Sequence, residues 1–152
     1  MNFLKIILFV FFVSVFYTAV SQTISKTVDM SFGNIAVSGP GTVVINPNGS
    51  RGCTGGITLP GLTGTVTAAS FDVSGTALHT YSITLPVIGS SISSGGNTMT
   101  VDTFTSDPSI TGTLSAGGTQ QLKIGATLHV NGAQASGTYT SGSTFAVTIN
   151  YN

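Results

Sequence analysis

Apolar and polar side chains alternate with a period of two along several stretches of the chain. Every second residue shares one face of an extended chain over 24–32, 79–85 and 122–130. The final ten residues follow the same rule, with Phe145, Val147, Ile149 and Tyr151 alternating with small or hydroxyl-bearing residues. After residue 21, no segment repeats apolar residues at helical spacing over three turns. The pattern therefore predicts β-strands.

Shorter stretches typical of strands lie at 41–45, 64–73 and 98–105. Between the strands lie clusters of turn-forming residues: SGPG, NPNGSRG, PGLTG, SSISSGGN, SDPS, SAGGT and SG. Short strands with frequent turns are typical of an antiparallel sandwich or barrel. We predict an all-β protein, a single immunoglobulin-like antiparallel β-sandwich of about eight or nine strands, because each strand has one polar and one apolar face.

The first 21 residues differ from the rest. Lys5 precedes an apolar run from Ile6 to Phe16, and the small residues Ala19 and Ser21 follow. This order is typical of a signal peptide that is cleaved after Ser21. An uncleaved membrane anchor is the alternative, but the apolar run is shorter than the roughly 20 residues that spanning needs. We therefore predict a signal peptide at 1–21 and one β-sandwich domain at 22–152.

Charge is scarce. Only 5% of the residues are charged, and Glu and Trp are absent. Without Lys5, three basic residues face four aspartates, a net charge of −1. Nucleic acids and anionic membranes both require clustered Lys and Arg, so neither is an expected partner.

Cys53 is the single cysteine. It lies in the Gly-rich sequence GSRGCTGG, which we expect to be a loop, and it has no partner for an internal disulfide. An unpaired thiol in an exported protein either joins another chain or is buried. We favour an inert thiol, because no His is close in the sequence to activate it.

The residues that carry acid–base chemistry are few. His79 and His129 are isolated histidines, Asp107 belongs to a turn, and Asp102 with Asp107 forms only a weak Ca²⁺ candidate. The sequence contains no G-x-S-x-G, H-E-x-x-H, C-x-x-C or P-loop motif. We predict that the protein is not an enzyme and that it has no catalytic, cofactor-binding or metal-binding residues and no cofactor.

Two further features of the sequence are typical of binding sites but also occur in ordinary structural roles. Asn48-Gly49-Ser50 matches an N-glycosylation sequon, a pattern short enough to occur by chance. An aromatic platform for sugars would draw on Tyr81, Phe104, Tyr139 and Tyr151, which we expect instead to be core or strand residues.

Six segments together resemble a bacterial secreted family that is catalogued as domain-of-unknown-function family 4402. They are SFGNI at 31–35, GTVVINPNG at 41–49, TAASFDVSG at 67–75, MTVDTFTSDPS at 99–109, LKIGATLHV at 122–130 and GTYTSGSTFAVTINYN at 137–152. The FG motif and the residues Tyr139 and Tyr151 are more distantly similar to spore coat protein U and chaperone-usher fimbrial subunits. That resemblance implies an immunoglobulin-like sandwich to which another chain contributes a strand.

We predict a non-enzymatic exported protein, a fimbria-like or coat-like structural subunit that assembles through β-strand edges. Its expected location is the cell surface or extracellular space of a Gram-negative-type bacterium, with the periplasm in transit. The expected partners are further copies or other surface subunits, without membrane insertion once the signal peptide is removed. The alternative is a monomeric binding or adhesion module that recognises carbohydrate or protein.

Overall fold

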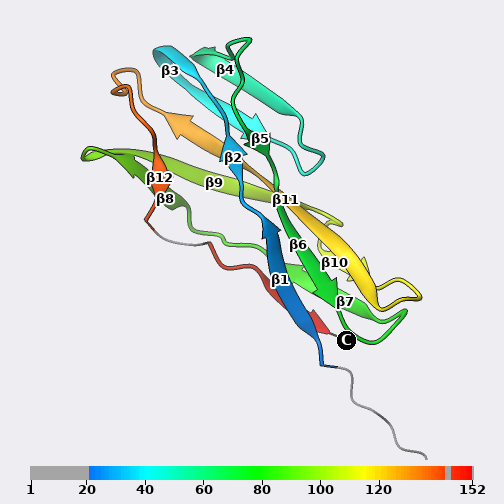
Figure 1. Cartoon of the computed structure of the whole chain (residues 1–152). Coiled ribbons are helices and arrows are strands. Elements are labelled where there is room, and N and C mark those ends of the chain that lie inside the picture. Colours follow the sequence, from blue (N-terminus) through cyan, green and yellow to red (C-terminus); the bar gives the residue numbers. More distant parts are fainter. Residues whose placement is uncertain (1–20, 143–144, 152) are drawn as a thin grey trace, which may run out of the picture.

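A computed structural model describes residues 21–142 and 145–151, and every regular element in them is a β-strand (Figure 1). All the strand pairs are antiparallel. The predicted all-β antiparallel class is therefore confirmed. Apart from Ser21, the predicted signal peptide lies outside the described residues.

The strand β11 (Thr119–Val130) is the centre of the large sheet. One of its edges pairs with β9 (Asn97–Asp107). The other edge pairs first with β6 (Ala69–Ser74) and then, beyond Ile124, with β3 (Ala36–Ile45). The sheet is extended by β1 (Thr23–Val28) next to β6, by β4 (Arg51–Thr58) next to β3, and by β8 (Ser90–Ser94) and β12 (Thr140–Ser141) beyond β9.

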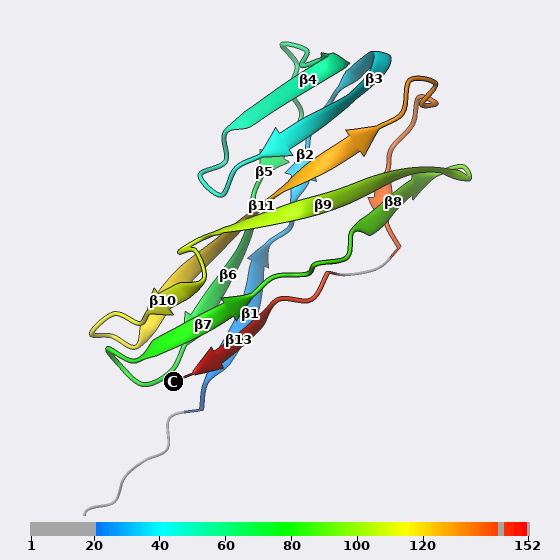
Figure 2. The same ribbon diagram turned by 180° about the vertical axis from the view of Figure 1, so that it is seen from behind.

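Two smaller sheets accompany the large one. The first has the order β10 (Thr111–Thr113), β7 (Thr80–Thr84), β13 (Thr148–Tyr151), and the second pairs β2 (Ser31–Phe32) with β5 (Val66–Thr67). Both ribbon views show an elongated arrangement (Figures 1 and 2). The sheet β10-β7-β13 lies with β1 and β6 near one end, whereas β3, β4, β8 and β12 lie toward the other.

Two groups of buried side chains hold these sheets together. The first core lies between β6, β7 and β11 and contains Ala69, Phe71, Val73, Tyr81, Ile83, Leu114, Leu122 and Ile124. The second core is formed by β3, β4, β9 and β11 of the large sheet and contains Val43, Ile57, Met99, Val101, Ala126, Leu128 and Val130. Met30 and Phe104 pack against both cores. Each fully buried aliphatic side chain contributes about 1.5–3 kcal/mol, so the two cores provide most of the stabilisation.

Two segments that the composition indicated as turns are strands, and these expectations were wrong. The Gly-rich sequence around Cys53 forms β4, in which Cys53 is paired with Val43. Gly41 and Gly55 allow the backbones to touch there, since a Cβ on Gly41 would lie 2.2 Å from the Thr54 carbonyl oxygen. SSISSGGN forms β8 and a turn at Gly95-Gly96. In both cases backbone pairing with a long neighbouring strand outweighs local composition.

Other predicted strands are divided, and the 13 strands of the described residues exceed the predicted eight or nine. The stretch 24–32 is divided into β1 and β2, which pair in different sheets. Likewise 64–73 becomes β5 and β6, separated at Ala68. Strand switching between sheets produces these divisions, because hydrophobic alternation does not say which neighbour a strand pairs with.

The alternating C-terminal run packs against its own domain. Within 145–151, Phe145, Val147, Ile149 and Tyr151 all contact the first core, whereas the intervening residues are exposed. The Phe145 ring is stacked on Phe104 with ring centroids 5.1 Å apart and meets Phe71 edge-on at 6.4 Å. The predicted contact face is confirmed, although the regular strand covers only Thr148–Tyr151.

We predict that Phe145→Asp lowers the free energy of unfolding by at least about 3 kcal/mol, because it removes an aromatic contact and places a charge among apolar groups. Thr148→Asp, at an exposed position of β13, changes it by less than about 0.5 kcal/mol. Urea unfolding of the two variants checks the comparison. Equal effects would contradict the placement of Phe145 in the core.

Candidate functional site

Asp102 and His129 meet on the outer surface of the large sheet. The carboxylate oxygen Oδ1 of Asp102 lies 2.8 Å from Nε2 of His129, and the Thr103 hydroxyl donates to the same oxygen at 2.8 Å. The hydrogen bond from Thr103, followed by that from His129, holds the pKa of Asp102 below its usual value. A catalytic triad would need the hydroxyl to be hydrogen-bonded to the imidazole rather than to the carboxylate. The cluster is thus an exposed hydrogen-bonded pair in which the Thr103 hydroxyl contacts the carboxylate and not the imidazole.

Thr103 adopts a left-handed conformation, with φ of 50°, at an irregularity in the pairing between β9 and β11. Such a backbone is costly for a β-branched residue, and it usually marks a bulge. Here the bulge shifts the side-chain alternation of β9, so that Val101 and Phe104 both face the interior. The unusual φ therefore has a structural cause.

The remaining acid–base candidates are separated. Asp102 and Asp107 are five residues apart on β9, roughly 16 Å along a strand, which is too far for joint Ca²⁺ ligation. His79 is exposed just before β7. Among the described residues, no group of three or more His, Cys, Asp or Glu side chains is arranged to hold a metal ion.

The four aromatic residues of the possible sugar platform do not form one surface. Tyr81 is fully buried and packs against Tyr151 with ring centroids 5.8 Å apart. Burial raises the pKa of both phenols, with the charge of Tyr151 as a second cause at Tyr81. Tyr139 lies elsewhere, and its hydroxyl donates to the Ala135 carbonyl while accepting from Gln134, both at 2.8 Å. These contacts are structural.

Cys53 is exposed on β4, so the alternative of a buried thiol was wrong. Its sulfur contacts the Ile57 carbonyl oxygen at 3.3 Å. The sequon residue Asn48 is exposed in the turn between β3 and β4. Its side-chain oxygen accepts a hydrogen bond of 2.9 Å from the Ser50 amide. Neither residue joins a larger chemical cluster.

Several strands have a neighbour on one side only. Among the described residues, these strands include β1, which pairs with β6 alone, and β13, which pairs with β7 alone. Five of the six residues of β1 are exposed, and only Ile24 is half-buried. The side chains of Gln22 and Tyr151 both approach Gly75, which places the start of β1 and the end of β13 at the same end of the molecule. The amino-acid composition did not show which strand edges have no paired neighbour, whereas the order of the strands in each sheet does.

The described part of the chain has a groove with a volume of about 950 Å³. Its lining includes Lys26, every residue from Asp29 to Ile35, and residues 137–141. Side chains of the second core line its depth, including Met99, Val101 and Leu128. Lys26 and Asp29 form an ion pair with each other, so the groove contains no unbalanced charge. Sequence reasoning missed this groove.

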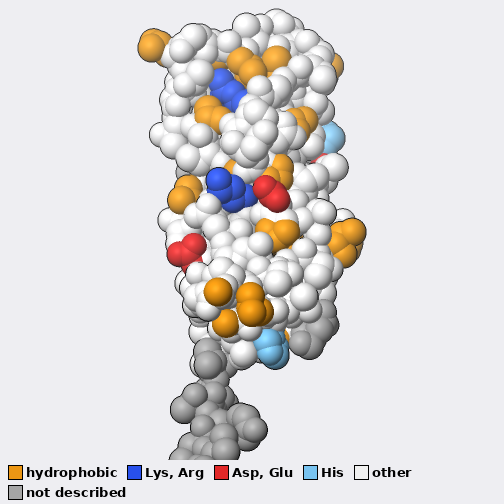
Figure 3. Space-filling view, turned by 90° about the vertical axis from the view of Figure 1, so that its right-hand side faces the viewer, with side chains coloured by type: hydrophobic (Ala, Val, Ile, Leu, Met, Phe, Trp, Pro, Cys, Tyr) orange, Lys and Arg blue, Asp and Glu red, His pale blue; other side chains and the backbone are white. Residues whose placement is uncertain are grey.

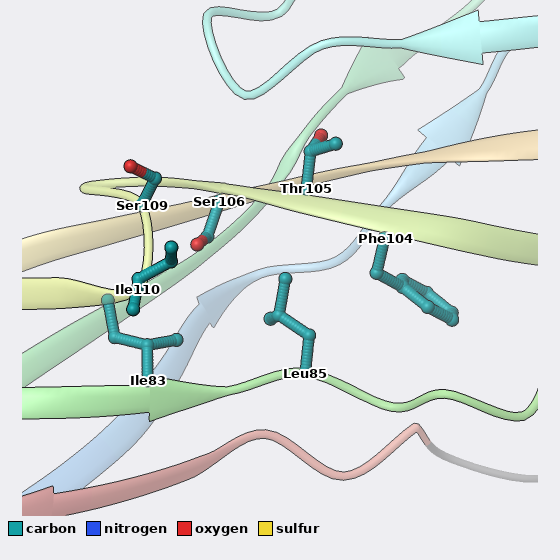
Figure 4. A pocket seen from close by; sticks show the side chains of 7 residues that line it. All are labelled: Ile83, Leu85, Phe104, Thr105, Ser106, Ser109 and Ile110. Carbon is teal, nitrogen blue, oxygen red and sulfur yellow. The ribbon is translucent and has the colours of Figure 1, made fainter.

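A smaller hollow of about 340 Å³ lies between β7 and β9. Figure 4 shows Ile83, Leu85 and Phe104 directed into this space, while Thr105 points away from it. Its lining has no charged side chain and therefore no acid–base group. The space-filling view likewise shows few charged side chains on this face, and one basic side chain lies directly beside an acidic one (Figure 3).

These features define an all-β protein of curled antiparallel sheets with exposed strand edges and an apolar groove. A family model described as Domain of unknown function (DUF4402) matches residues 23–151, and the chain belongs to this family. No curated protein and no solved structure matches the chain. The part of the chain that the structure describes also has no helix long and apolar enough to cross a membrane.

We predict that the stability difference between the parent and Asp102→Asn depends on pH. Because the folded-state pKa of Asp102 is lowered, its contribution is present above the unfolded value of about 3.9 and is lost as the pH falls through the folded pKa. In urea unfolding, the free energy of unfolding of Asp102→Asn should therefore fall further below that of the parent at pH 6 than at pH 2.5. Asp72→Asn, at an exposed position of β6, controls for the lost charge. A deficit equal at both pH values would contradict the assignment.

Proposed function

We propose that this chain is a non-enzymatic, exported structural subunit of the bacterial surface that assembles with further copies through β-strand edges. The observation that carries the proposal is β1, a six-residue strand with five exposed residues and one hydrogen-bonded neighbour in the described structure. An open edge presents N–H and C=O groups that readily accept a strand from another molecule.

The usual protection of such an edge is sparse at β1. Soluble proteins block edges with charges, proline, bulges or covering elements. In β1 the single charge is Lys26, which is paired with Asp29, and the pairing irregularity comes only after Lys26. An edge with so little protection favours strand addition. The low overall charge adds little electrostatic repulsion between copies.

The finer fold assignment belongs to the same proposal. An immunoglobulin-like sandwich is supported by the first core, which lies between the sheet β10-β7-β13 and the large sheet. Tyr139 adds to this, since a tyrosine hydroxyl bonded to the backbone a few residues upstream is typical of such sandwiches. The signal-peptide pattern at 1–21 supports export, and the similarity to spore coat protein U and fimbrial subunits supports assembly.

A monomeric extracellular binding or adhesion module is the second candidate, because the groove is large enough for a ligand. Carbohydrate is the less suitable ligand, since Tyr81 is buried and the Tyr139 hydroxyl is already bonded within the chain. Recognition of protein fits this groove better.

Proline substitutions at neighbouring positions of β1 test the assembly. Successive residues of an edge strand direct their N–H groups to opposite sides, so only one of Ser25→Pro and Lys26→Pro removes a hydrogen bond to β6. We expect that variant to lower the melting temperature. The other should melt like the parent but lose assembly, because proline blocks the outer edge.

Light scattering after size exclusion and imaging of producing cells measure assembly. We expect polymers or filaments for the parent protein. A strictly monomeric parent without filaments, or normal assembly by both proline variants, would refute the proposal.

A further inference from the structure

The groove exposes apolar side chains of both cores. Phe104 packs against both cores, Phe145 against the first and Ile92 against the second, and each of them lines the groove while only half-buried. The buried side chains of Met99 and Leu128 line it as well. The groove is therefore a concave apolar surface that connects the two cores.

Several polar groups of the segment from Asp29 to Asn34 are already bonded within the chain. The Asp29 carbonyl oxygen accepts a hydrogen bond of 2.7 Å from the Thr67 hydroxyl. The Arg51 guanidinium donates to the carbonyl oxygens of Phe32 and Asn34, and β2 is paired with β5. These groups are therefore not available to a ligand.

The other polar groups at the groove are neutral as a set. Lys26 and Asp29 form an ion pair, and the Tyr139 hydroxyl both donates and accepts a hydrogen bond within the chain. Exposed hydroxyl groups also line the groove, at Thr65, Thr138 and Thr140. This lining suits a ligand with an apolar part that needs no hydrogen bond and a polar end without charge.

The size of the groove favours a single hydrocarbon chain. Its volume of about 950 Å³ lies within the range of small-molecule pockets. On β9 its lining residues extend from Met99 to Phe104, which is roughly 16 Å along a strand. With carbon–carbon bonds of about 1.5 Å, an extended chain of about twelve carbons is of similar length.

We propose that the groove binds the hydrocarbon chain of an uncharged single-chain amphiphile, such as a fatty alcohol or a monoacylglycerol. The chain contacts Ile92, Met99 and Phe104, and the uncharged head lies near the exposed hydroxyl groups of the lining. Met30 and Met99 are flexible and adapt to chains of different shape. This inference goes beyond the proposed assembly and requires no open strand edge.

A segment of another protein is the competing occupant of this groove. Its backbone N–H and C=O groups would lose their hydration and meet carbonyl groups that are already bonded. A hydrocarbon chain loses no hydrogen bond when it leaves water, and its burial is favourable in proportion to its area. The hydrogen bonds of the groove therefore favour the amphiphile.

Displacement of the uncharged dye Nile red from the exported domain tests the proposal. We expect octanol, decanol and dodecanol to displace the dye, with one molecule bound per chain. Each added methylene should tighten binding about fourfold, because it adds buried apolar area. No displacement, or displacement that does not depend on chain length, would overturn the proposal. Displacement by the peptide SVTISVTI but not by dodecanol would also overturn it and assign the groove to a protein segment.

Variants locate the bound alcohol. Ile92→Glu and Ile35→Glu each put a charge into the apolar lining and should weaken decanol binding at least about tenfold. Their matched controls, Ser91→Glu and Ala36→Glu, alter exposed neighbours outside the lining and should leave it within about twofold. If Ile92→Glu does not fold, Ile92→Thr replaces it with an expected loss of about fivefold. Parent-like binding by the Ile92 and Ile35 variants would exclude the groove.

The groove and the β1 edge are separable in the same preparation. The β1 proline variant that does not assemble should bind decanol as the parent does. Assembly by a parent that does not bind decanol would overturn this inference and leave the proposed assembly intact. A monomeric parent that binds decanol would support this inference and refute the assembly.

Discussion

The pairing of β11 along both of its edges is the interaction on which the rest of the structure depends. On one side β11 pairs with β9, and on the other it pairs with β6 and then β3. Leu122 and Ile124 of β11 lie in the first core, whereas Ala126 and Leu128 lie in the second. One continuous backbone therefore connects the two cores, and every strand of the large sheet takes its position from it.

This central strand also determines where the molecule stays open. Because the sheet grows outward from β11 in two directions, its last strands have a single neighbour, and β1 is one of them. The smaller sheets cover part of the large sheet but leave the groove beside β12. The open edge and the groove are thus consequences of one topology.

The candidate sites differ in how well the sequence anticipated them. Asp102 and His129 were expected to be separate residues, whereas they form an exposed pair. That pair was not foreseen, because 27 residues separate its members and their meeting depends on the register of β9 against β11. The groove was missed for a related reason. Its floor residues have the same alternation as any core strand, and alternation does not reveal whether a second layer covers them.

The sequence by itself determined the strand-forming period, the near absence of charge, and the inward face of the last residues from Phe145 to Tyr151. These are local properties, because side chains alternate in any extended segment whatever its neighbours. Tertiary structure alone decided that the Gly-rich stretch around Cys53 is β4, that 24–32 divides between two sheets, and that β1 remains an edge. Such outcomes depend on which backbones pair across long sequence separations, and that choice is governed by the packing of the whole domain.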